Sequence, residues 1–160
     1  MPANPTSDLS SDLSSERLVQ LMRAVGPSLA LYIQDSSIWS RPGAEEIKLA
    51  IADLCSDLKS LFDRAGMVLD EQHTRTPQVK YPLRYTALHD VELEYLLPQL
   101  RQETQSQIAL VGSWSDTAGD AGDVLKEART SLQSHLDVLE QLAAKLVSDR
   151  TESAKPSAST

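Results

Sequence analysis

The sequence predicts an all-α protein, and the predicted architecture is a four-helix bundle. Three observations support this: apolar residues recur at intervals of three and four in four segments, breaker-rich stretches separate these segments, and aromatic residues make up only 4% of the chain. Intervals of three and four place apolar side chains on one face of a helix, whereas β-sheet cores favour aromatic and β-branched residues. A chain of 160 residues is long enough for one such core.

The segment that follows Gly43 has the clearest helical pattern. Glu45 and Glu46 lie in its first turn, where carboxylates offset the positive end of the helix macrodipole. Its apolar stripe is widened on one side, as in helices that face a core. The stripe consists of Ile47, Ile51, Leu54, Leu58, Leu61, Ala65 and Val68, widened by Cys55, Phe62 and Leu69.

The fourth segment repeats this pattern. Asp120 and Asp123 stand at its start and Lys145 near its end, in agreement with the helix macrodipole. Its stripe consists of Leu125, Ala128, Leu132, His135, Leu139, Leu142 and Leu146, widened by Leu136 and Ala143.

The first and third segments keep the same spacing but contain an interior proline, which removes a backbone hydrogen bond and costs about 3 kcal/mol in a straight helix. Because the first stripe stays in register across Gly26 and Pro27, we expect two short helices on one axis there. Pro98 lies one turn inside the third segment, where we expect a kink or a break. The first stripe is Leu18, Met22, Val25, Leu29, Tyr32, Ser36 and Trp39, and the third is Leu93, Leu97, Leu100, Thr104, Gln107, Val111 and Trp114.

The predicted bundle covers residues 16–150. Residues 1–15 and 151–160 are rich in Ser, Pro, Thr, Ala and Asp, so we expect flexible tails at both ends. Short links around 41–44 and 115–119 predict two antiparallel hairpins.

The connection from His73 to Arg84 is long and carries two prolines, so it is able to run the length of a helix. Such a crossover would leave the second and third helices parallel and is the preferred topology. An up-down-up-down order is the alternative.

Two helical hairpins joined by a long extended segment, here Gln72 to Tyr85, resemble the ferritin-like superfamily. The resemblance covers most of residues 15–148 and rests on architecture alone. Dimetal enzymes of that family carry a glutamate on two helices and a Glu-x-x-His pair on the other two, and this sequence contains no Glu-x-x-His. What the resemblance implies is therefore a scaffold.

Two pairs of residues have the spacing of metal ligands in helical bundles. Asp70 and His73 form one pair, and His89 and Glu92 form the other; each pair places an oxygen and a nitrogen ligand on one helical face. An up-down-up-down order would bring the two pairs together for iron or another divalent metal, whereas a crossover would separate them. Solvated charges at helix ends are the alternative interpretation.

His135 lies on the apolar stripe of the fourth segment, so we expect its imidazole to face the core beside the third helix. There it would meet Glu103 and Thr104. Together with Gln107 these residues would form a buried polar layer that fixes the register of the helices.

Composition and motifs exclude several functional classes. With 15 basic and 23 acidic side chains the net charge is −8, which disfavours nucleic acid and membrane surfaces as partners. A single cysteine, Cys55, allows no internal disulfide, and a cytoplasmic location is expected. No nucleophile elbow or glycine-rich phosphate loop occurs, so we predict no catalytic residue and no cofactor.

The remaining interpretation is a non-catalytic interaction or assembly protein, which binds a protein partner or associates with itself as a homo-oligomer. Trp39 and Trp114 are expected either to close the core or to anchor a partner. The alternative function is a ferritin-like metal-binding or oxidative-stress protein with non-standard ligands.

Overall fold

The computed structural model describes residues 5–36 and 43–156, and every regular element in these ranges is helical. This confirms the all-α prediction for the described part of the chain. In order, the elements are α1 (Pro5–Val25), α2 (Leu29–Asp35), α3 (Glu45–Glu71), the 3₁₀ helix η2 (Leu83–Leu88), α4 (Leu93–Gly112) and α5 (Gly119–Ser153).

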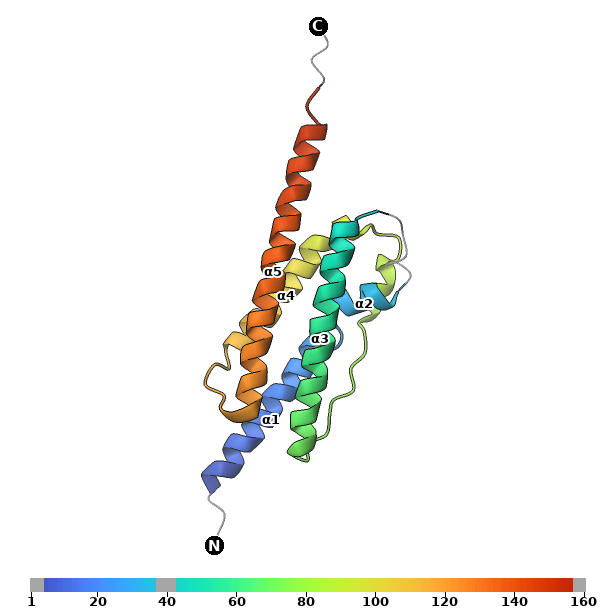
Figure 1. The fold of residues 1–160 in the computed structure, drawn as a ribbon. Helices are drawn as coiled ribbons and strands as arrows, with labels where there is room; N and C mark the ends of the chain where they lie inside the picture. Colours follow the sequence, from blue (N-terminus) through green and yellow to red (C-terminus); the bar gives the residue numbers. More distant parts are fainter. Residues whose placement is uncertain (1–4, 37–42, 157–160) are drawn as a thin grey trace.

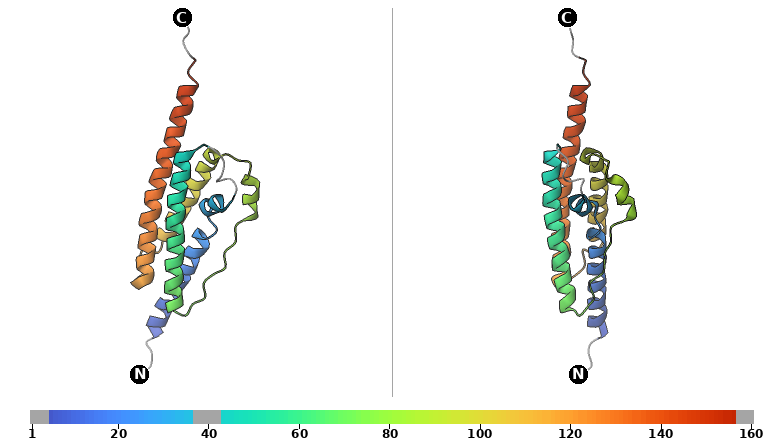
Figure 2. Two further views of the ribbon diagram at one scale, coloured as in Figure 1. Left: turned by 45° about the vertical axis from the view of Figure 1, so that its right-hand side comes forward. Right: turned by 90° about the vertical axis from the view of Figure 1, so that its right-hand side faces the viewer.

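The long helices α1, α3, α4 and α5 lie side by side (Figure 1). In this view α1 and α5 run upward, while α3 and α4 run downward. α5 packs mainly against α3 and α4, and α1 packs mainly against α3. Residues 72–92, which include η2, return along the outside of the molecule from the end of α3 to the start of α4 (Figure 2).

α3 forms because its apolar residues share one face, and that face is buried. Six of the seven residues of the predicted stripe are buried, while Val68 is half-buried. Cys55 and Leu69, which widen the stripe, have no exposed surface. The predicted helix and its core-facing side are therefore confirmed.

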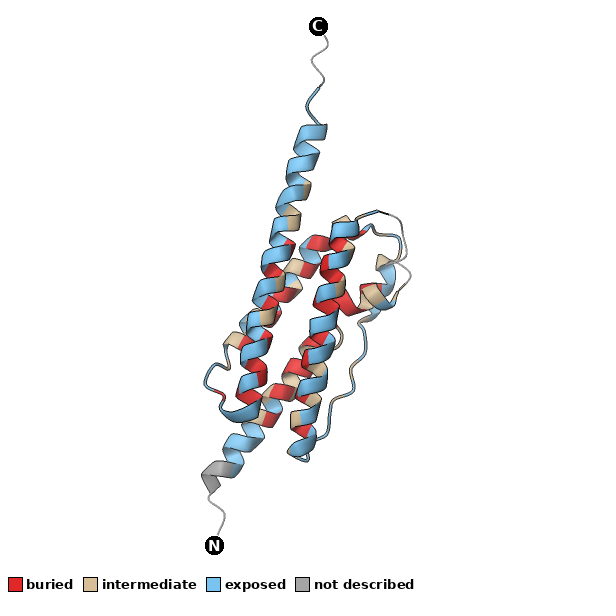
Figure 3. Cartoon of the chain, in the orientation of Figure 1, coloured by how far each residue is buried: buried red, intermediate tan, exposed pale blue. Residues whose placement is uncertain are grey.

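α5 buries its predicted stripe only over its first two thirds. Leu125, Ala128, Leu132 and Leu139 are buried, whereas Leu142 and Leu146 are half-buried. The last turns extend past the ends of the neighbouring helices and are exposed (Figure 3). The stripe thus predicts the helix correctly, but it does not predict how much of the helix is covered by neighbouring helices.

The first segment breaks at Gly26 and Pro27, but the expectation of two helices on one axis is wrong. Ser28 has extended backbone angles, φ −66° and ψ 151°, which turn the chain. α2 consequently lies across the long helices (Figures 1 and 2) and contacts α3 and α4. Four of its seven residues are buried, namely Leu29, Ala30, Leu31 and Ile33, so burial of this short apolar run outweighs continuation of the first stripe.

α4 continues through Pro98 without a break in its helical assignment. The proline is exposed, so its ring lies on the solvent side of the helix. Leu96, Leu97 and Leu100 around it are buried. Their packing holds the helix together where one backbone hydrogen bond is missing.

Residues 5–15, expected to be a flexible tail, are helical, because α1 begins at Pro5. Proline is favoured at the first helical position, and the Ser14 hydroxyl donates to the Ser10 carbonyl at 2.9 Å. These residues also extend a helix that is packed against the core from Ser15 onward, so their helical conformation needs no separate nucleation step.

At the other end of the chain, α5 extends three residues into the second predicted tail, to Ser153. Within the described ranges, no helix combines the length and the apolar content required to span a bilayer.

Candidate functional site

The two predicted metal-ligand pairs lie at opposite ends of the helix packing. Asp70 and His73 are at the end of α3, whereas His89 and Glu92 precede α4. Because α3 and α4 run in the same direction, the end of one and the start of the other lie at opposite ends of the molecule (Figure 1). The His89 Nε2 atom lies 2.6 Å from the Tyr32 hydroxyl. Among the described residues, no group of three His, Cys, Asp or Glu side chains is close enough to hold a metal ion. The residues present therefore do not fit the metal site of the ferritin-like enzymes.

The four residues of the predicted polar layer do not meet in one layer. The Gln107 amide donates to the Ala24 carbonyl at 3.1 Å, and the Thr104 hydroxyl donates to the Leu100 carbonyl at 2.8 Å. Glu103 accepts from the Leu29 backbone N–H at 2.8 Å. His135 instead faces Asp57 of α3, whose Oδ2 atom is 2.6 Å from His135 Nε2. His135 was expected to lie beside the predicted third helix, which is α4. This is wrong, because its position on the stripe faces α3 at the α3–α5 contact.

A serine adjoins this histidine pair, but the geometry is not that of a nucleophile. The Ser131 hydroxyl donates to the same Asp57 oxygen at 3.1 Å. A catalytic serine is hydrogen-bonded to histidine, with the carboxylate on the far side of the imidazole. Here the carboxylate lies between the serine and the histidine, so the imidazole is not placed to accept the serine proton.

Cys55 is no nucleophile either. The side chain is completely buried, and burial raises the pKa of its thiol to about 12. The thiol is therefore protonated at neutral pH, whereas the reactive form of cysteine is the thiolate.

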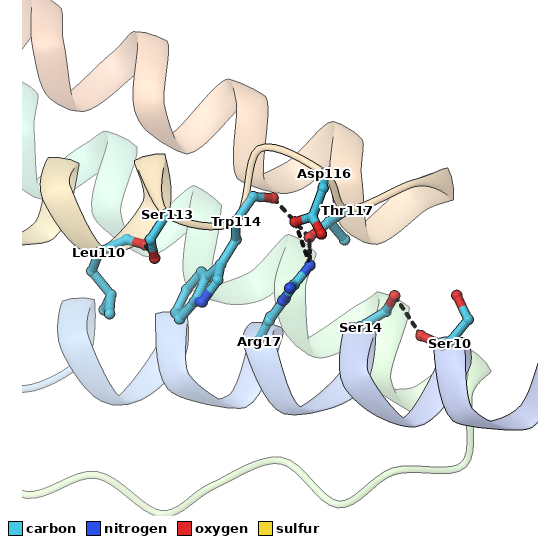
Figure 4. A network of polar contacts seen from close by, with 8 residues as sticks. All are labelled: Ser10, Ser14, Arg17, Leu110, Ser113, Trp114, Asp116 and Thr117. Carbon is cyan, nitrogen blue, oxygen red and sulfur yellow. Dashed lines mark hydrogen bonds and ion pairs between the residues drawn. The ribbon is translucent and has the colours of Figure 1, made fainter.

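Arg17 connects α1 to the turn before α5 (Figure 4). Its guanidinium donates to Asp116 at 2.9 Å and to the Thr117 hydroxyl at 2.6 Å. In the same turn Trp114 is half-buried and packs against the core, as expected of an aromatic residue that closes a core. Trp39 lies outside the described residues.

The strongest candidate site is a groove between the end of α3 and the start of α5, which we call the acidic groove. It encloses about 240 Å³. Val68 and Val124 are its most buried apolar residues, and Met67 is 64% exposed. Its lining consists of Arg64, Met67, Val68, Glu71, Asp120, Asp123 and Val124.

Charge in the acidic groove is unbalanced. Arg64 is the only basic residue among the described residues of the lining; it forms an ion pair with Glu127 and is thereby neutralised. Among the described residues, Glu71, Asp120 and Asp123 have no ion-pair partner. Three carboxylates thus surround exposed and half-buried apolar side chains without an opposite charge.

The local helix structure explains only part of this charge. Asp120 lies in the first turn of α5, where a carboxylate stabilises the helix. Asp70 and Glu71 lie in the last turn of α3, which contains no basic residue, and negative charges there oppose the macrodipole. Their placement therefore costs stability, and a cost of this kind is common at functional sites.

Met67 and Glu71 were not among the predicted site residues. Two signals were available: an acidic pair at the wrong end of a clear helix, and a methionine outside the apolar stripe. Neither signal indicates which helix lies opposite.

Comparison of the chain with protein-family models, with curated proteins and with solved structures finds no match.

Proposed function

We propose that this protein is a non-catalytic helical interaction module whose acidic groove binds a basic amphipathic helix of a partner protein. The observation that carries the proposal is the combination, in one groove, of the exposed Met67 with three carboxylates that form no ion pair with any described residue. Apolar side chains of the partner would enter the groove and its lysines or arginines would pair with the rim. Methionine suits such a surface because its side chain is flexible and polarizable.

The size of the groove supports a peptide side chain as its occupant. Pockets for independent small ligands usually measure about 300–1,000 Å³, and the groove encloses about 240 Å³. The net charge of −8 would also accelerate association with a basic partner. A second copy of this acidic chain is a less favourable occupant, because its own charge opposes the approach.

The proposed architecture is a four-helix bundle with a ferritin-like crossover, which serves as a scaffold. It is supported by the parallel directions of α3 and α4 and by the long connection between them on the outside of the molecule. A metal-binding function is not part of the proposal, because the predicted ligand pairs are separated by the length of the helices. A cytoplasmic location is part of it, since a chain with one buried thiol is compatible with a reducing compartment.

A peptide titration followed by NMR would test the proposed function. The probe is an amphipathic peptide with leucines at helical spacing and lysines on its other face; the control peptide has glutamates in place of the lysines. We expect saturable shifts of the amides around Met67, Glu71 and Asp123 with the lysine peptide only. Raising the salt concentration to about 0.5 M should weaken binding, because a shorter Debye length screens the charges.

Matched variants would separate the groove from the rest of the surface. Met67→Ser should weaken binding of the lysine peptide by about tenfold or more, equivalent to about 1.4 kcal/mol. Val147→Ser should leave it unchanged, because Val147 is 65% exposed but lies near the far end of α5. Equal binding of both peptides would refute the proposal. A stable homodimer that shields Met67 would favour self-association instead.

The carboxylates at the end of α3 should have opposite effects on stability and binding. Because they oppose the helix macrodipole, the double variant Asp70→Asn, Glu71→Gln should raise the free energy of unfolding by about 0.3–1 kcal/mol per site at low ionic strength. The same variant should bind the lysine peptide more weakly. Urea unfolding at neutral pH measures the first effect, with Glu152→Gln near the end of α5 as the control. A loss of stability in the double variant would mean that these carboxylates are structural.

A further inference from the structure

A second region of interest lies around Glu103, where α4, α2 and η2 meet. Glu103 Oε2 accepts the Leu29 backbone N–H at 2.8 Å, and Oε1 accepts the Tyr85 hydroxyl at 3.3 Å. These residues are 74 and 18 positions away in the sequence. Glu103 thus supplies the acceptor at the start of α2, where Ser28 forms no side-chain cap.

In the described part of the chain, no cation contacts Glu103 directly. Among the described residues, no lysine, arginine or histidine nitrogen lies within 4.0 Å of its carboxylate. The guanidinium of Arg84 instead lies over the Tyr85 ring, 5.1 Å from its centroid. Burial raises the pKa of Glu103, and its two hydrogen bonds and the charge of Arg84 only partly oppose this shift. A carboxylate in such surroundings is stabilised by a cation that reaches it.

An open cavity of about 380 Å³ leads to this carboxylate. Leu29 and Tyr85 are buried in its wall and Glu103 is half-buried, while Arg84, Gln99 and Gln102 are exposed at its rim. At about 30 Å³ per water molecule, the cavity has room for a small organic molecule. Each carboxylate oxygen of Glu103 accepts one hydrogen bond from a described residue and so retains a lone pair for a further donor.

We propose that this cavity binds a small organic molecule through a primary ammonium group, with Glu103 as its counter-ion. The ammonium would donate to the free lone pairs of the carboxylate and lie against the Tyr85 ring. The amide groups of Gln99 and Gln102 would hydrogen-bond the polar remainder of the ligand. This site is separate from the acidic groove, so it does not depend on the proposed function.

Other ligand classes fit the cavity less well. A metal ion usually needs more than one carboxylate from the protein, and Glu103 is the only carboxylate among the described residues that line the cavity. A simple anion would be repelled by Glu103, and a neutral molecule would leave its charge unpaired. Arg84 at the rim favours amines that also carry a carboxylate, since its guanidinium would pair with that carboxylate.

Three probes of equal chain length would test the site: butylammonium, 4-aminobutyrate and butyrate. In NMR titrations we expect saturable shifts of the Gln99 and Gln102 side-chain amides with the two amines and none with butyrate. Glu103→Gln should abolish these shifts, whereas Glu94→Gln should not, because Glu94 is on α4 but outside the cavity. Equal shifts with butyrate, or unchanged amine binding by Glu103→Gln, would overturn the proposal.

Arg84→Gln distinguishes a simple amine from an amino acid. If Arg84 pairs with the ligand carboxylate, Arg84→Gln weakens binding of 4-aminobutyrate. Butylammonium has no carboxylate, so removing the neighbouring positive charge should strengthen its binding. If Arg84→Gln does not weaken binding of 4-aminobutyrate while Glu103→Gln abolishes binding of both amines, the ligand is recognised as an amine alone. Both results support the ammonium site.

The pH dependence of the wild-type protein provides a test that requires no variant. Of the described ionisable residues, Tyr85 and Arg84 act on Glu103, and burial raises the pKa of Tyr85 to about 12. Tyr85 therefore stays protonated between pH 4 and neutrality. A primary amine stays cationic there, with a pKa of about 10. Amine affinity should therefore fall as Glu103 becomes protonated on acidification. Constant affinity from neutral pH down to about 4 would overturn the proposal.

Discussion

Replacing Leu58 with alanine should lower the free energy of unfolding by about 2–5 kcal/mol, through lost burial and the cavity left behind. Leu58 is 1% exposed in the middle of α3, and Leu139 of α5 is buried to the same extent. We expect a loss of the same size for Leu139→Ala. Urea unfolding followed by circular dichroism would measure both.

Leu49 of the same helix provides the matched control. It is 66% exposed, so Leu49→Ala removes the same atoms from the surface of α3. Because alanine has the highest helix propensity, this variant should change stability by less than about 0.5 kcal/mol. If Leu49→Ala were as destabilising as Leu58→Ala, the buried face of α3 would be wrongly assigned.

Gly122→Ala should be the second strongly destabilising substitution. A Cβ atom at Gly122 would lie 2.2 Å from the Thr117 carbonyl oxygen and 2.9 Å from its carbon, both backbone atoms. The start of α5 would have to move away from the preceding turn, and overpacking of this kind typically costs about 1–3 kcal/mol or more. Thermal unfolding of the variant would measure the loss.

Gly66→Ala, in contrast, should increase the stability of the protein. A Cβ atom there would meet only side-chain atoms, Thr76 Cγ2 at 3.5 Å and Met22 Cε at 3.7 Å, which are ordinary contacts. Alanine inside a helix restricts the unfolded chain, so this variant should gain about 0.5–1 kcal/mol. A similar loss for both glycines would contradict the close contact at Gly122.

Local patterns predicted the long helices well. The stripe from Ile47 to Ala65 is buried as expected, because helical spacing alone determines which side chains share a face. The same reasoning failed for α2. Its run from Leu29 to Ile33 is apolar on every side, a signal of a fully buried helix. The prediction of two helices on one axis did not take this signal into account.

The candidate sites were harder to predict because their residues are distant in sequence. Glu103 was assigned to a layer with His135, yet its partners are Leu29 and Tyr85. For the acidic groove, the unfavourable charge at Glu71 could be read from the sequence. That Met67 and Glu71 of α3 face Asp120 of α5 could not.

By itself, the sequence determined the packed parts of the long helices and which of their faces are buried, since amphipathic periodicity depends on residues three and four apart. Only the tertiary structure decided which helices became neighbours, how α2 turns, and which polar groups meet. The physical reason is that hydrophobic burial is non-directional. A stripe specifies that a face must leave water, but many neighbours satisfy that requirement equally well, and the choice among them places Met67, Glu71 and Glu103.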